Sequence, residues 1–156
     1  MRKIGLLIIC LIITYSIGII GGIFAESGLK SEWYESVRHG INLPSITFPV
    51  VWNILFLLIG FSLWLAFGKA EKGHRKNIVI AYSTNFIFNI FWSIFYFRMH
   101  NIGLAFIASI AILLSTIWMM AVAFKIDERA TYLLVPYLIW ICFATLLNYM
   151  SFLKVA

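Results

Sequence analysis

The sequence predicts an all-α integral membrane protein, a single domain built as a bundle of five transmembrane helices. Hydrophobic residues make up 63% of the 156 residues and charged residues only 12%, whereas soluble domains average about half apolar and a quarter charged. A spanning helix takes about 20 mostly apolar residues, and such stretches recur five times. They cover residues 4–24, 46–67, 78–97, 102–124 and 132–152. No stretch between them is long enough for a second domain.

The first apolar stretch, residues 4–24, is expected to be a retained helix. It is longer than the apolar core of a signal peptide, which is about 7–15 residues. Gly18 and Gly22 lie four residues apart near its end and permit close approach of another helix. That helix belongs either to the same chain or to a second copy of it.

The connection between residues 25 and 45 is long for a compact bundle, and long ordered loops tend to be functional. It contains the pair Trp33 and Tyr34, and Pro44 precedes the second helix. An aromatic pair followed by a proline-stiffened return suits a lid over a cavity on this side of the membrane. The alternative is a loop that Trp33 anchors at the membrane surface.

Three of the expected helices carry a face of aromatic, small and amide side chains, because these residues recur at helical spacing. The faces comprise Phe48, Trp52 and Phe56 in the second stretch, Asn85, Asn89 and Trp92 in the third, and Trp140, Phe143, Ala144, Leu147 and Asn148 in the fifth. Such faces suit a flat apolar ligand with a few polar edges. The alternatives are that the amides bond neighbouring helices and that the tryptophans lie at headgroup level.

No charged residue lies near the centre of an apolar stretch, and all three histidines fall in or beside connections. This argues against a proton-driven exporter, a haem-ligating cytochrome and an intramembrane protease. Cys10 and Cys142 lie within apolar stretches without CxxC spacing. Both are therefore expected to be buried free thiols, and no metal site is predicted.

Basic residues crowd on one side of the five spans, the side of the N-terminus. That side carries Arg2, Lys3, Lys69, Lys72, Arg75, Lys76, Lys125 and Arg129, against Lys30, Arg38, Arg98 and Lys154 on the other. The expected orientation therefore has the N-terminus in the cytoplasm and the C-terminus outside. Basic anchors beside anionic lipids also account for the net charge of +6 without a nucleic-acid partner.

Four motifs in these segments resemble one family. They are Trp33-Tyr34, Pro44-x3-Phe48-x3-Trp52, Asn89-x2-Trp92-Ser93 and Pro136-Tyr137-Leu138-x-Trp140-x2-Phe143-Ala144-x2-Leu147-Asn148. In this order the chain resembles the translocator protein family, also called TspO, tryptophan-rich sensory protein or peripheral benzodiazepine receptor. It departs from the family pattern at Leu43, where members commonly have a second proline, and at Ile46, where a tryptophan is common.

The resemblance implies a pocket that opens toward the first connection and binds tetrapyrroles such as protoporphyrin IX, or isoquinoline carboxamide and benzodiazepine compounds. It also implies a homodimer, with no covalently bound cofactor. The asymmetry of the basic residues fits a bacterial plasma membrane, with a mitochondrial membrane as the alternative. Carried over by position, the pocket residues are Phe48, Trp52, Phe56, Asn89, Trp92, Trp140, Phe143, Ala144 and Leu147, with Tyr34 and Pro44 covering them.

Some bacterial members of the family are associated with light- and oxygen-dependent breakdown of protoporphyrin IX. The resemblance assigns that catalytic role to Trp52 and Trp140. An indole against a photoexcited porphyrin would form a radical and direct oxidation; the alternatives are sacrificial quenching and plain stacking. Two other function classes stay open, a carrier of porphyrin or lipid-like molecules and a stress-response regulator that acts through a protein partner.

The end of the fifth stretch also contains a loose sterol motif. Leu147-x-Tyr149-x4-Lys154 satisfies the pattern that is tied to cholesterol in animal members of the family. Tyrosine and lysine also commonly anchor helix ends at the membrane surface, which is the alternative interpretation.

Overall fold

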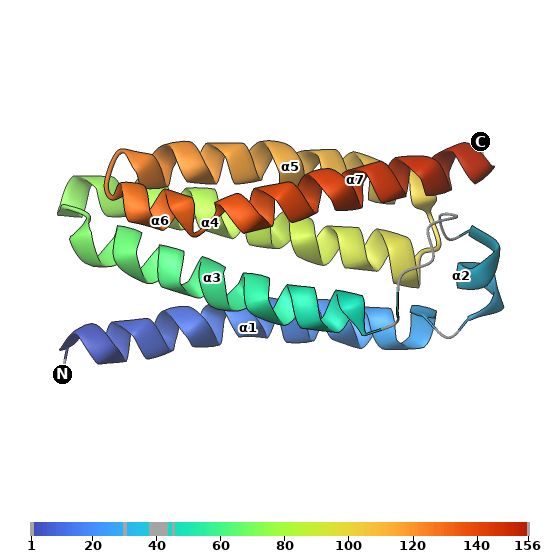
Figure 1. The fold of residues 1–156 in the computed structure, drawn as a ribbon, viewed down its shortest axis with the longest axis horizontal. Coiled ribbons are helices and arrows are strands. Elements are labelled where there is room, and N and C mark those ends of the chain that lie inside the picture. The colour runs from blue at the N-terminus through green and yellow to red at the C-terminus, as the bar shows by residue number, and fades with distance from the viewer. Residues whose placement is uncertain (1, 30, 38–43, 45, 156) are drawn as a thin grey trace.

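The computed structural model describes residues 2–29, 31–37, 44 and 46–155, and it is helical almost throughout them (Figure 1). Within this part of the chain, five helices are long and apolar enough to cross a membrane, which confirms the predicted fold class. The helices are α1 (Arg2–Leu29), α2 (Glu32–Val37), α3 (Thr47–Lys69), α4 (Lys72–Ser93) with its π-helical continuation η1 (Ile94–Arg98), α5 (Ile102–Phe124), α6 (Glu128–Tyr132) and α7 (Val135–Val155).

Several helices extend beyond the apolar stretches, because polar residues add turns outside the membrane. α4 begins at Lys72 rather than at residue 78, and its first two turns are exposed. The fifth span is divided into α6 and α7 just before Pro136, which has no N–H for a helical hydrogen bond and is tolerated only in a first turn.

The connection between α1 and α3, for which the sequence predicts a loop, contains the short helix α2. The hydroxyl oxygen of Ser31 accepts a hydrogen bond from the backbone N–H of Tyr34 at 3.2 Å, as a capping residue does at a helix start. Glu32 and Glu35 lie in the first turn, where a carboxylate is stabilised by the helix dipole.

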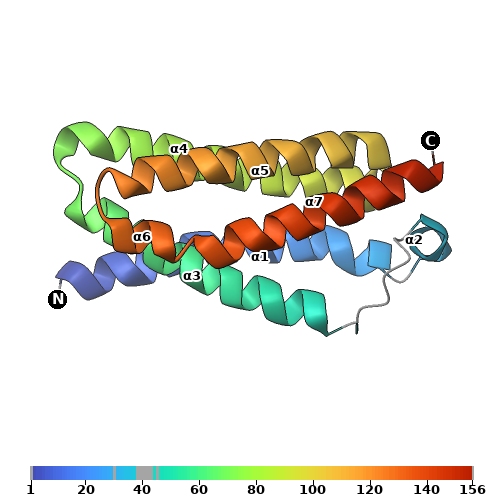
Figure 2. The same ribbon diagram turned by 45° about the horizontal axis from the view of Figure 1, so that its top comes forward.

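The helices run antiparallel, so the two ends of the bundle differ. The N-terminus and the α3–α4 and α5–α6 turns lie at one end, and α2 and the C-terminus lie at the other (Figure 1). α1 packs on α3 and α4, and α5 packs between α4 and α7. α3 and α7 diverge toward the α2 end, as Figure 2 shows.

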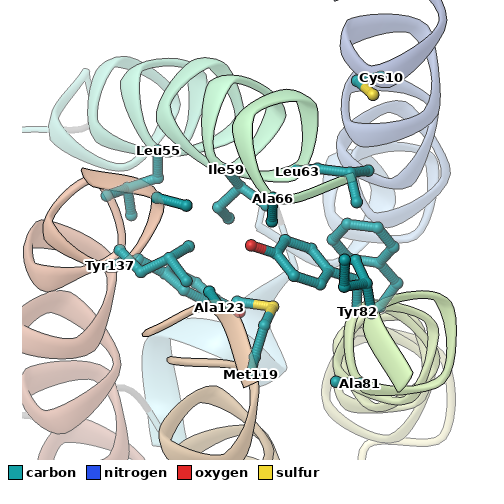
Figure 3. Packing of buried hydrophobic residues seen from close by; sticks show 14 of the residues in the cluster. Cys10, Leu55, Ile59, Leu63, Ala66, Ala81, Tyr82, Met119, Ala123 and Tyr137 are labelled. Atoms are coloured by element: carbon teal, nitrogen blue, oxygen red, sulfur yellow. The ribbon is translucent and has the colours of Figure 1, made fainter. Parts of the chain in front are cut away.

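The end that contains the N-terminus is closed by the main core. Tyr82 and Tyr137 reach into this core from opposite sides (Figure 3) and are almost fully buried. The hydroxyls of Ser62 and Tyr82 lie 2.6 Å apart, and Ser62 also donates to the carbonyl of Ala130 at 2.7 Å. These bonds hold α6 against α3 and α4.

Asp127 joins α3 and α6 at the same end of the bundle, where its side chain is buried. Its carboxylate lies 2.8 Å from the ammonium nitrogen of Lys69 and 3.2 Å from Nε of Arg129, and it caps α6 by accepting from the Arg129 backbone N–H. The hydrogen bonds from Arg129 and then Lys69 lower the pKa of Asp127 to about 2, because both favour its charged form.

Gly18 of α1 lies directly against the Phe56 ring of α3. A Cβ atom there would lie 2.5 Å from the ring of Phe56, whereas a Cβ atom on Gly22 would meet nothing within 4 Å. Gly18 therefore serves a contact inside the chain. Cys10 is buried as expected, but Cys142 is exposed, because it lies on the outer surface of α7.

Candidate functional site

A cavity of about 560 Å³ occupies the half of the bundle nearer α2. It forms where α3 and α7 diverge (Figure 2), and α1, α2, α4, η1 and α5 supply the rest of its wall. The volume lies within the range of about 300–1,000 Å³ that is usual for small-molecule sites. Glu26 is the one charged residue among the described residues that line it, so the wall is largely apolar.

The α3 wall consists of the aromatic face that the sequence predicts. Phe48, Trp52 and Phe56 all line the cavity, since residues four apart on a helix share a face. The rings of Trp52 and Phe56 are stacked, with 5.4 Å between centroids and 27° between planes. They form a flat apolar surface, and the missing side chain of Gly18 leaves room for the Phe56 ring.

The α7 wall carries Trp140, Ala144 and Leu147. The Trp140 ring meets Phe48 of α3 edge to face, with 5.7 Å between centroids. Its indole nitrogen is buried and has no hydrogen-bond partner within the described part of the chain. Phe143 does not line the cavity. Its ring packs against the Trp140 ring, with 5.6 Å between centroids.

The α4 wall contains two of the predicted residues, and each is held by a bond to α7. The Asn89 amide donates to the hydroxyl of Tyr137 at 2.7 Å, and the indole nitrogen of Trp92 lies 3.0 Å from the side-chain oxygen of Asn148. Asn85 lies behind this wall, fully buried, and bonds α5 through Thr116 at 3.0 Å. Asn85 therefore holds helices together, as the alternative interpretation of the amides expects.

The α2 helix contributes Tyr34 to the cavity. Its neighbour Trp33 faces the end of η1 instead, where its ring stacks on His100 with 4.1 Å between centroids and meets Tyr96 edge to face at 5.7 Å. His100 has a positive φ of 53°, which turns the chain sharply between η1 and α5. The aromatic pair thus docks α2 onto the bundle.

Pro44, the other residue expected to cover the pocket, is exposed and does not line it. Residues 38–43, which include Arg38 and Leu43 of the sequence analysis, lie outside the described residues.

Residues 9–153 match the sequence model of the TspO/MBR family. The chain belongs to the TspO/MBR family. The tryptophan-rich protein TspO of Chlorobaculum tepidum is 32% identical over 152 residues, which cover 95% of this chain and 94% of that protein. The uncharacterized membrane protein YtaB of Bacillus subtilis is 29% identical and covers 96% of each chain. With its five apolar helices, this family member is an integral membrane protein.

A third relative extends the family match to a protein named for sensing. The tryptophan-rich sensory protein of Cereibacter sphaeroides is 29% identical over 119 residues, which cover 76% of this chain and 73% of that protein.

Some lining residues of this TspO/MBR family member were not singled out by sequence reasoning. Gly21 of α1, Tyr96 of η1 and Ser151 of α7 line the cavity. Tyr96 and Ser151 continue the helical spacing of Trp92 and Asn148, so extending each face by one turn would have found them. The Ser151 hydroxyl is buried and faces the Tyr96 hydroxyl.

The proposed sterol motif does not form one surface in this TspO/MBR family member. Leu147 is buried and lines the cavity, whereas Tyr149 is 43% exposed. Residues two apart on a helix point to nearly opposite sides, since each step turns by about 100°. Lys154 lies near the end of α7 and is exposed. A ligand in the cavity would reach Leu147 alone.

Proposed function

We propose that this TspO/MBR family member binds a flat tetrapyrrole such as protoporphyrin IX in the cavity between α3 and α7. Isoquinoline carboxamide and benzodiazepine compounds would occupy the same place. One observation carries the proposal: Trp52 with Phe56 and Trp140 line a single cavity from two diverging helices. Flat aromatic surfaces favour stacking on a planar ligand, which adds to the free energy of burial.

A polar atom of the cavity supports this proposal. The Trp140 indole nitrogen is buried without a partner in the described part of the chain, and buried polar groups are usually hydrogen-bonded. A carboxylate or carbonyl of a bound ligand, or a water that accompanies it, would accept from this N–H. The carboxylates of protoporphyrin IX are acceptors of this kind.

The distribution of basic residues supports an orientation for the site. The end of the bundle that contains the N-terminus carries most of the lysines and arginines, which favours a cytoplasmic position for that end. The cavity would then open in the outer half of a bacterial plasma membrane.

A second candidate function is light- and oxygen-dependent breakdown of the bound porphyrin. It is favoured by the position of Trp52 and Trp140, which both line the cavity. An excited porphyrin sensitises dioxygen, and the indole rings are the side chains in this wall that are most readily oxidised. Their place beside the ligand would direct the oxidation to one edge of the macrocycle.

Binding is tested by titrating detergent-purified protein with protoporphyrin IX in the dark and following tryptophan fluorescence. We expect saturable quenching in the wild type. Ala144→Phe fills the cavity and should abolish saturation, whereas Leu146→Phe, on the 52%-exposed outer position of the same helix, should leave it unchanged. Equal binding by both variants would show that the ligand lies outside this cavity.

A further inference from the structure

A second cavity, of about 300 Å³, lies at the opposite end of the bundle, between the start of α4 and the end of α5. Its described lining residues are His74, Asn77, Trp118, Val122, Lys125 and Ile126. None of them lines the pocket near α2, so the two cavities are separate. We call this second cavity the α4–α5 groove.

The α4–α5 groove is charged at one end and apolar at the other. His74 lies in the first turn of α4, and Lys125 follows the last residue of α5. Trp118 and Val122 lie on the same face of α5 as Lys125, and Trp118 is about 10 Å deeper along the helix at a rise of about 1.5 Å per residue. Trp118 is also 43% exposed, on a protein whose helices face lipid.

The charges around the groove leave its cations available. Asp127, the nearest acid along the chain to Lys125, is already paired with Lys69 and Arg129. Within the described residues, Lys125 and His74 have no ion-pair partner. Lys72 adds positive charge on the first turn of α4. The exposed acids Glu71 and Glu128 lie within three residues of His74 and Ile126 in the sequence.

The start of α4 adds a further attraction for an anion. Glu71 precedes the helix and makes no side-chain capping hydrogen bond. The backbone N–H groups of His74 and Arg75 donate to the Glu71 carbonyl at 3.0 and 3.3 Å. The first turn of α4 also carries the positive end of the helix dipole. Phosphate groups commonly bind at such helix ends.

We propose that the α4–α5 groove binds the phosphate headgroup of an anionic phospholipid. Lys125 and His74 contact the phosphate, and Trp118 and Val122 contact the glycerol and upper acyl chain. Basic pockets between transmembrane helices bind such headgroups on the cytoplasmic side, and tryptophan favours the headgroup level. The apolar end of the groove favours a lipid over a free phosphate ion, because a phosphate ion has no apolar part to contact Trp118.

Native mass spectrometry of the detergent-purified full chain with phosphatidylglycerol tests this proposal. We expect Lys125→Gln to weaken binding of the first lipid by about tenfold, the loss typical of a charge-assisted contact. Lys76→Gln is the matched control: it removes the same charge from an exposed position outside the groove, where salt screens it, and should change binding less than about twofold. Both positions are exposed, so both variants should fold.

Two further measurements separate the lipid from other sources of phosphate. Trp118→Ala should weaken phosphatidylglycerol binding, whereas the lipid-facing control Ile117→Ala should not. Equal effects of Lys125→Gln and Lys76→Gln, or equal binding of phosphatidylcholine, would overturn the proposal. Displacement of the lipid by inorganic phosphate, with no effect of Trp118→Ala, would assign the groove to a free anion and also overturn it.

Discussion

The indole N–H of Trp92 donates a hydrogen bond to the side-chain oxygen of Asn148, across 3.0 Å and 56 residues of sequence. The amide nitrogen of Asn148 donates to the carbonyl of Ala144 at 2.8 Å, which holds the amide in this orientation. The Trp92 ring also stacks on Tyr96, with 5.5 Å between centroids. This bond therefore joins α4 to α7 in the wall of the cavity and helps to set the cavity width.

We predict that Trp92→Phe and Asn148→Ala are coupled. A double-mutant cycle on unfolding in mixed micelles should give a coupling energy of about 1 kcal/mol, as for other hydrogen bonds between membrane helices. Both single variants should also weaken protoporphyrin IX binding. Trp64→Phe, which removes a 3.0 Å bond to the carbonyl of Lys3 away from the cavity, should leave the affinity unchanged. Strict additivity would mean that the Trp92–Asn148 bond is not formed in solution.

We predict that Gly18→Ala alters the pocket through Phe56. The added Cβ would lie 2.5 Å from the Phe56 ring, so the ring must move and disturb its stack with Trp52. Overpacking of this kind typically costs about 1–3 kcal/mol, and both thermal stability and porphyrin affinity should fall. Gly5→Ala is the control on the same helix, because its Cβ would meet nothing within 4 Å. A Gly18→Ala variant that binds like the Gly5→Ala variant would contradict the proposed stacking surface.

We predict that Asp127 makes stability depend on pH at the closed end of the bundle. Its pKa of about 2 is below the ordinary value of 3.8, so its charged form stabilises the fold above about pH 4 and this contribution is lost as the pH falls to about 2. Asp127→Asn keeps a helix-capping side chain but loses the ion pairs, and should lower the Tm at pH 7 by about 2 °C.

Thermal unfolding at several pH values checks this prediction, with the exposed Glu128→Gln as the matched loss of charge. The wild type and Asp127→Asn should converge near pH 2. A constant difference from pH 7 to pH 2 would instead assign the effect to packing.

We predict that Trp52→Phe combined with Trp140→Phe separates binding from photochemistry. Phenyl rings retain the apolar stacking surface, so saturable binding in the dark should persist. It should weaken by about tenfold, because Trp140→Phe removes an N–H that would donate to a ligand carboxylate. Protein-dependent bleaching of protoporphyrin IX under light should be suppressed. Trp64→Phe with Trp118→Phe removes the same number of indoles outside this cavity and should bleach like the wild type. Bleaching at the wild-type rate in the first pair would exclude a role for these tryptophans.

Helical spacing alone predicts most members of the aromatic faces, but not all of them. Trp52 and Phe56, or Ala144 and Leu147, share a face because three or four residues nearly complete a helical turn, and this follows from spacing alone. Phe143 has almost the same spacing from Trp140 but lies at the edge of that face and packs against the Trp140 ring. A small rotation of the helix decides such a case, and spacing does not determine that rotation.

The sequence by itself determined the membrane class, the five spans and most of the aromatic faces on three helices, because hydropathy and helical period are local properties of the chain. Only the tertiary structure decided that α3 and α7 diverge, that Trp92 meets Asn148, and that Asp127 pairs with Lys69. These relationships depend on the packing of side chains distant in sequence, which sets how helices cross. The cavity exists because that packing leaves the α3–α7 space open at one end and fills it at the other.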